Sequence, residues 1–204
     1  HLNAAKGILV GLLATAGVAG AGSLFNAGIN RLSSIEDARM SMEVMMGGDV
    51  KRADAFLDEI LDFAKTTPYA FTQLSSSAKN LFAYGMDQKN IVPTLKAIGD
   101  LSAASGKGSE GIDSLAAAFG KMQVSGKASG EQLTQITEAG VPALKILANQ
   151  AGVSVEEIQK QIASGKVSAD TAISGLVKGI AEGTDGVAGK TQALGGVMEK
   201  LKQT

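Results

Sequence analysis

Short apolar patterns with helical spacing, separated by glycine-containing turns, run through most of this chain. Residues 126–173 show the arrangement most densely, with three such patterns in succession. The phrase Ser-Gly-Lys-x-Ser occurs twice, at 125–129 and at 164–168, and each copy leads from a turn into a new pattern. Glycine often ends a helix in a left-handed conformation. No alternating apolar and polar run of strand length stands out, so the sequence predicts an all-α fold, a multi-helix array of short amphipathic helices with Gly turns.

The first 32 residues differ from the rest, because residues 7–30 carry no charge and are rich in glycine and alanine. We expect an uncharged Gly/Ala-rich apolar helix over 1–32, followed by a compact all-helical domain over 33–204. Small residues let helices approach closely, in water or in lipid. A buried or oligomer-facing helix is favoured over a membrane span, because glycine and alanine contribute little transfer free energy. The candidate helix-packing residues, or residues of a membrane segment, are Gly7, Gly11, Gly17, Gly20 and Gly22.

The other helices are predicted from their apolar faces and from the residues that begin them. Asp49, Asp87 and either Ser33 or Ser34 are expected to cap helices, and Ser154-Val-Glu-Glu157 has the pattern of a capping box. Helices are expected at 33–46, 50–65, 71–84, 88–104, 112–123, 131–138, 141–152, 154–164, 168–180 and 194–201, with a loop at 105–109 and another at 183–189.

Turn residues divide these helices. Thr137 is expected on the buried face of its helix, and Pro142 at the first helical position, which proline tolerates. The residues expected to form structural turns are Pro68, Gly140, Pro142 and Gly152.

The sequence offers little chemistry. Cysteine is absent and the single histidine is His1, which excludes thiolate metal sites and histidine-based catalytic triads. The loop over 105–109 lacks the pattern of a phosphate-binding loop and follows no strand. The acidic residues of 54–62 fall at helical spacing and are interpreted as a solvated face. We therefore predict no catalytic residue, no metal site, no cofactor and no enzymatic activity.

One segment has the spacing of a helix-turn-helix. Ala148, Gly152 and Ile158 occupy the positions of the small residue, the turn glycine and the core residue of that motif. The second helix, however, would carry two carboxylates in its first turn and a single lysine. A DNA-reading helix needs exposed hydrogen-bond donors there, and the net charge of −1 gives no basic surplus. The segment is therefore interpreted as a packing corner, and no specific nucleic-acid site is expected.

Several phrases, taken in order, resemble one family. The segment 64–71 (AKTTPYAF) is similar to its turn after a helix, and 119–127 (FGKMQVSGK) to its Phe-Gly-Gln-x-x-x-x-Gly-Lys. Residues 135–142 (QITEAGVP) and 165–168 (GKVS) are similar to two further turns. The series covers about 38–200 and resembles the N-terminal region of tail tape measure proteins of long-tailed bacteriophages and prophages.

That resemblance implies a long, mainly helical, non-enzymatic structural protein that fills the tail tube and sets tail length. It implies a homo-oligomer, with three copies preferred to six, and contacts with tail tube proteins, tail-tip or baseplate proteins and tail assembly chaperones. The expected location is the lumen of the virion tail, after assembly in the host cytoplasm. Members of the family leave with the genome, so the host membrane and envelope are a further expected partner and location. The chain does not begin with Met, and we expect it to be a piece of a longer one.

Two alternatives stay open from the residues alone. A membrane-active, pore-like helical protein rests on the apolar run within 7–30. A helix-turn-helix DNA-binding regulator rests on 147–158. An enzyme is the least favoured class.

Overall fold

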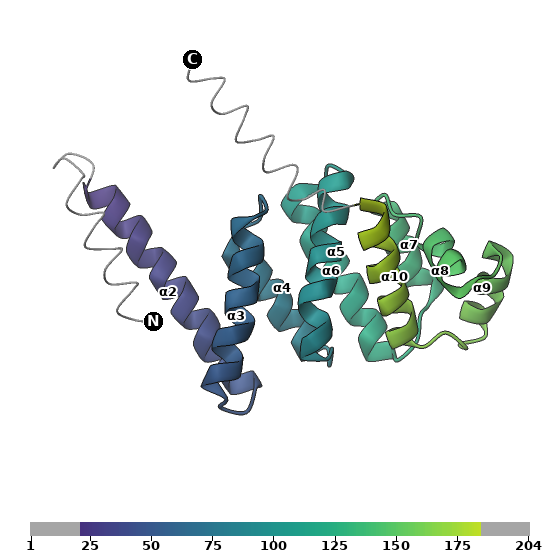
Figure 1. Cartoon of the computed structure of the whole chain (residues 1–204), viewed down its shortest axis with the longest axis horizontal. Coiled ribbons are helices and arrows are strands. Elements are labelled where there is room, and N and C mark those ends of the chain that lie inside the picture. Colours follow the sequence, from purple (N-terminus) through teal and green to yellow (C-terminus); the bar gives the residue numbers. More distant parts are fainter. Residues whose placement is uncertain (1–20, 185–204) are drawn as a thin grey trace, which may run out of the picture. The chain divides into compact units, whose positions relative to one another are not determined.

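The computed structural model describes residues 21–184, with side chains described for 33–183. Within these residues the fold is all-α, which confirms the predicted class (Figure 1). The helices in chain order are α2 (Ala21–Met45), α3 (Val50–Lys65), α4 (Phe71–Ala83), α5 (Gln88–Ala104), α6 (Gly108–Ser125), α7 (Gly130–Glu138), α8 (Ala143–Ala151), α9 (Val155–Ala163) and α10 (Ala169–Thr184).

Contacts between residues divide the chain into two units, His1–Asp54 and Ala55–Thr204, with the division inside α3. The expected boundary between residues 32 and 33 stays a prediction. The expected cap at Ser33 or Ser34 is wrong, because α2 runs without interruption from Ala21 to Met45. No glycine or proline lies between 29 and 46, and serine weakens a helix only modestly, so the helix continues.

In the first unit, α2 and the start of α3 are joined by polar contacts. Arg39 Nε donates to Asp54 Oδ1 at 2.7 Å, and Arg39 Nη1 lies 3.4 Å from Glu36 Oε1. Asp49 Oδ1 accepts a hydrogen bond from the amide of Arg52 at 3.0 Å, as expected for a residue that caps α3. Of the predicted apolar segment, Gly22 lies in α2, whereas Gly7, Gly11, Gly17 and Gly20 lie outside the described residues.

The second unit has its core around α6, which packs against α4, α5, α7 and α10. Phe119 and Met122 of α6 are fully buried, as are Leu95 and Ile98 of α5. The chain then returns, and α10 packs against α5 and α8 (Figure 1). Aliphatic residues and a few aromatic rings therefore make one continuous core from α4 to α10.

The turn that contains Pro68 is anchored by Tyr69. Its ring is buried, and its hydroxyl Oη donates to the carbonyl oxygen of Gly99 in α5 at 2.7 Å. Gly99 leaves room for this ring and for Phe63, because a Cβ there would lie 2.9 Å from Phe63 Cζ. The buried ring and its hydrogen bond fix the segment after α3 against α5.

Tyr69 makes stability depend on pH in the alkaline range. Burial, with a smaller contribution from the charge of Asp100, raises the pKa of Tyr69 from 10.0 to about 12. The folded state holds the phenolic proton of Tyr69 more tightly than the unfolded chain does. The contribution of this proton to the free energy of unfolding is therefore complete below pH 10 and is lost as the pH rises through about 12. We expect Tyr69→Phe to lose less stability than the parent over that range, in urea unfolding followed by circular dichroism. Equal losses in the two proteins would show that this proton does not contribute.

Several details differ from the sequence-based expectations. The helix α6 begins at Gly108 rather than at 112, and Gly111 in its first turn sits closely against Ser102. Thr137 is exposed rather than buried, and its hydroxyl bonds to the carbonyl oxygen of Leu133 at 2.8 Å. Gly183 is helical rather than part of a loop.

Two predicted helix starts also differ in detail. Asp87 occupies the cap position of α5 but makes no side-chain cap bond, and its carboxylate lies 3.4 Å from Lys89 Nζ. Pro142 stands one position before the first residue of α8. The tight turn in which the amide of Ala143 donates to the carbonyl of Val141 at 2.7 Å delays the helix by one residue.

Candidate interaction site around the paired turns

The two Ser-Gly-Lys-x-Ser phrases lie side by side and pair with each other. Lys127 and Ser168 form an isolated antiparallel bridge. The amide of Ala128 donates to the carbonyl of Val167, and the amide of Ala169 to the carbonyl of Gly126, each at 3.0 Å. We call this pairing the turn clip. It brings together the two ends of the segment 128–167, which contains α7, α8 and α9.

The repeated residues act alike in one respect and differ in another. Gly126 and Gly165 both have left-handed backbone, with φ of 68° and 69°. Ser168 Oγ accepts from the amide of Thr171 at 3.2 Å and so caps α10. Ser129 instead donates its hydroxyl to the side chain of Gln132 and makes no cap bond to α7. Both copies are therefore turns that begin helices, as predicted, but only the second supplies a side-chain cap.

The turn clip should depend on its two glycines. An L-residue in the left-handed region costs about 1–2 kcal/mol, so we expect Gly126→Ala and Gly165→Ala each to lower the free energy of unfolding by that amount. Gly130→Ala is the matched control, because Gly130 begins α7 without a positive φ and a Cβ there meets nothing within 4 Å. Urea unfolding of the three variants tests this, and equal effects at all three positions would contradict it.

Two glycines of α10 provide close packing against α8. A Cβ on Gly175 would lie 3.2 Å from Leu147 Cδ2, and one on Gly179 would lie 2.3 Å from Ile146 Cγ2. Gln150 Nε2 adds a hydrogen bond to Glu182 Oε2 at 2.9 Å. These two glycines were not predicted from the sequence, although Gly175-x-x-x-Gly179 has the same spacing as Gly7 and Gly11. That spacing, inside a predicted amphipathic helix, is the signal that could have found them.

The turn residues predicted from the sequence lie as follows. Pro68 is in the turn between α3 and α4, and Gly140 has a φ of 93° after α7. Pro142 directly precedes α8, and Gly152 ends it with a φ of 67°. None of these four contributes a functional polar group, so their part is to place the helices.

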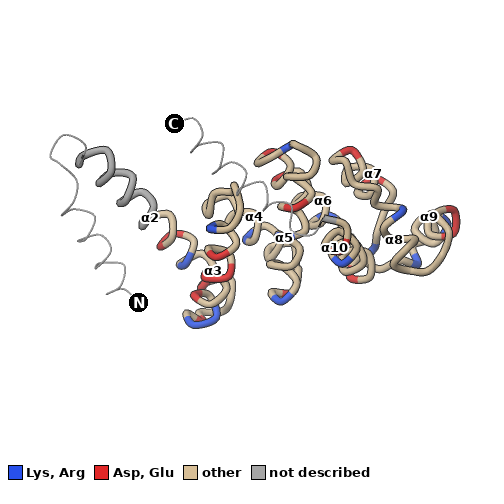
Figure 2. The backbone as a smooth tube through the Cα atoms, turned by 45° about the horizontal axis from the view of Figure 1, so that its top comes forward, with Lys and Arg blue, Asp and Glu red and all other residues tan. Residues whose placement is uncertain are grey.

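The corner between α8 and α9 has the predicted packing geometry. Ala148 and Ile158 are buried, and Ser154 Oγ accepts from the amide of Glu157 at 3.2 Å. Acidic residues lie in the first turn of α9 (Figure 2). Hydrogen bonds from its own backbone amide and from Ser154 lower the pKa of Glu156, which favours its charged form. Negative charge therefore lies where a DNA-reading helix would need donors.

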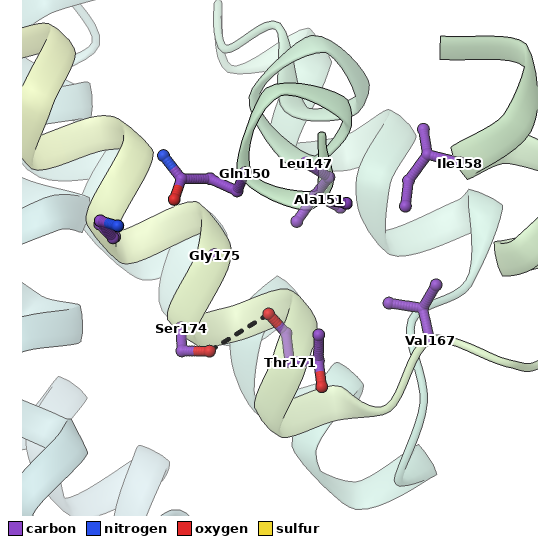
Figure 3. A pocket seen from close by; sticks show the side chains of 9 residues that line it. Leu147, Gln150, Ala151, Ile158, Val167, Thr171, Ser174 and Gly175 are labelled. Atoms are coloured by element: carbon purple, nitrogen blue, oxygen red, sulfur yellow. Dashed lines mark hydrogen bonds between the residues drawn. The ribbon is translucent and has the colours of Figure 1, made fainter. Parts of the chain in front are cut away.

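Grooves lie on both sides of α9. One, of about 270 Å³, is bounded by α8, α9 and α10, where the side chains of Leu147, Ile158 and Val167 converge (Figure 3). Thr171, Ser174 and Lys178 of α10 also line it. The other groove, of about 440 Å³, lies between α7, α8 and α9. Both are mainly apolar, so they suit apolar side chains of a protein segment better than a charged small molecule.

The remaining candidate positions contribute ion pairs and packing. Asp54 and Asp62, of the acidic face of α3, are paired with Arg39 and Lys65. Lys107 Nζ, which lies just before α6, donates to the carbonyl oxygen of Glu138 at 2.7 Å and so satisfies a carbonyl at the end of α7. Within residues 21–184, no group of histidine, cysteine or acidic residues could hold a metal ion. No described helix is long and apolar enough to cross a membrane.

The chain is similar to a known protein family and to a curated protein. A family model described as tape measure protein matches residues 26–204. A Mu-like prophage protein of Haemophilus influenzae, FluMu protein gp42, is 27% identical over 188 residues, which is 91% of this chain and 29% of that protein. The chain thus spans less than a third of the length of this relative. No solved structure matches the chain.

Proposed function

Because the chain belongs to the tape measure protein family, we propose that it is a structural segment of a phage tail protein that sets tail length during assembly. The observation that carries this proposal is the family match, which runs from residue 26 to residue 204. The all-helical array supports it, since a length-setting protein needs helices rather than a catalytic pocket. The proposal includes no enzymatic step and no cofactor.

The proposed location is the lumen of the virion tail, which the chain reaches during assembly in the host cytoplasm. The proposed partners are further copies of the chain, with three preferred to six, and the tail tube, tail-tip or baseplate proteins and tail assembly chaperones. Charges of both signs are interspersed along the described helices (Figure 2), which suits contacts with several proteins better than a nucleic-acid track.

Protease protection tests the location. Purified virions are treated with protease before and after DNA release, and peptides of this chain are followed by mass spectrometry. We expect the peptides to be present and protected in intact virions. They should be lost from the tails after release, because the chain is proposed to leave with the genome. Virions that contain no such peptides would contradict the proposal.

A contact with the host envelope is a second candidate function, and the uncharged run within 7–30 is the observation that favours it. We propose that this run meets lipid after release and helps the genome to pass. Flotation with liposomes tests it: the chain should float, and a chain lacking 7–30 should not. An intact chain that fails to float would remove this function and leave the length-setting role untouched.

A further inference from the structure

The groove between α7, α8 and α9 has the chemistry of a helix-docking site. Its floor is apolar, from Leu133, Leu144 and Ile162, and Thr137 and Gln159 also line it. Among the described residues that line it, Glu138 alone is charged. Few polar groups converge there, so the groove suits the apolar side chains of an amphipathic helix, with a cation beside Glu138.

The sequence after α10 has the matching pattern. Apolar residues stand at 193, 194, 197, 198 and 201, which is the spacing i, i+1, i+4, i+5, i+8 of a single helix face. The apolar face of α3 has the same spacing, at 56, 57, 60, 61 and 64. Over residues 190–202, Lys190, Lys200 and Lys202 outnumber the one acidic residue, Glu199, so this part of the sequence is basic.

The stretch follows α10, which packs against α8, one of the helices that bound the groove. Gly179 of α10 lies against Ile146, which is two residues from Leu144 in the groove. The helix α10 ends at Thr184, five residues after Gly179. The residues 185–192 can span up to about 26 Å, at about 3.3 Å for each extended residue.

We propose that residues 193–201 dock as an amphipathic helix in the groove between α7, α8 and α9 of the same chain, with Lys200 or Lys202 beside Glu138. The second groove, beside α10, is a poorer acceptor, because its one charged lining residue is Lys178. The basic stretch would be repelled there. The docked segment would cover the exposed side of α9. It would also hold together α7, α8 and α9, the helices that the turn clip encloses. This proposal stands independently of the length-setting role.

Disulfide trapping tests the proposal, because the chain contains no cysteine of its own. One variant combines Thr134→Cys, on the edge of this groove, with Val197→Cys. The matched control combines Ser174→Cys, in the other groove, with the same Val197→Cys; Thr134 and Ser174 are both exposed helical residues. A docked helix raises the local concentration of one thiol at the other, so we expect the first pair to oxidise within the chain at least about tenfold faster.

Equal rates for the two pairs would overturn the proposal. Disulfides formed mainly between chains would also overturn it, by showing that the groove takes a second copy. Charge provides a further measurement in the first variant. Glu138→Lys should slow the intrachain reaction, whereas Glu131→Lys, on α7 outside the groove lining, should leave it unchanged. An unchanged rate with Glu138→Lys would contradict the assigned ion pair.

Discussion

Replacing Phe119 with alanine is expected to lower the free energy of unfolding by about 3–5 kcal/mol. Phe119 is fully buried in α6, the helix that packs against α4, α5, α7 and α10. Removing the ring deletes apolar contacts and leaves a cavity, because the surrounding core relaxes only partly. Native domains are stable by only about 5–15 kcal/mol, so the loss should be visible as a large shift of the urea midpoint.

The matched control is Val124→Ala on the same helix. Val124 is 67% exposed, and a surface substitution of this kind is expected to change stability by no more than about 0.5 kcal/mol. Urea unfolding of both variants, followed by circular dichroism, gives the comparison. Similar midpoints for the two variants would mean that α6 is not at the centre of the core.

The second large effect is expected at Gly179. A Cβ there would lie 2.3 Å from Ile146 Cγ2, on a β-branched side chain that has one strongly preferred χ1 rotamer in a helix. Such overpacking costs about 1–3 kcal/mol. Alanine also favours the helical state by up to about 1 kcal/mol over glycine, so the two effects oppose each other in Gly179→Ala.

Gly183→Ala separates these effects. Gly183 lies in the same helix, and a Cβ there meets nothing within 4 Å, so only the helix preference changes. Gly179→Ala should therefore be less stable than Gly183→Ala by about 1–3 kcal/mol, the overpacking cost. If thermal unfolding showed the two variants equally stable, the close packing of α10 on α8 would not hold.

Local patterns in the sequence were sufficient to predict most of the described helices. Apolar spacing placed α3 and α5 with the bounds that the structure shows, and the expected caps Asp49 and Ser154 make their bonds. These features depend on residues three or four positions apart. The helix start expected near Ser33 is wrong, because the residues around it include no glycine or proline that would end the preceding helix.

Contacts between distant segments could not be predicted in this way. The repeat of Ser-Gly-Lys-x-Ser was visible, but nothing in it indicates that its two copies pair across 128–167. The hydrogen bond from Tyr69 to Gly99 likewise depends on how α5 packs beside the turn. The grooves beside α9 arise because that helix packs mainly on α8 and, to a lesser extent, on α7. The spacing of apolar residues in the sequence does not indicate which helices pack together.

Tail length tests the central proposal most directly. In-frame deletions of increasing length are made in the phage gene for this protein, and tails of the resulting particles are measured by electron microscopy. The account predicts tails that shorten in proportion to the deletion, by about 1.5 Å for each residue removed from extended helix. Particles that assemble with tails of unchanged length would contradict it.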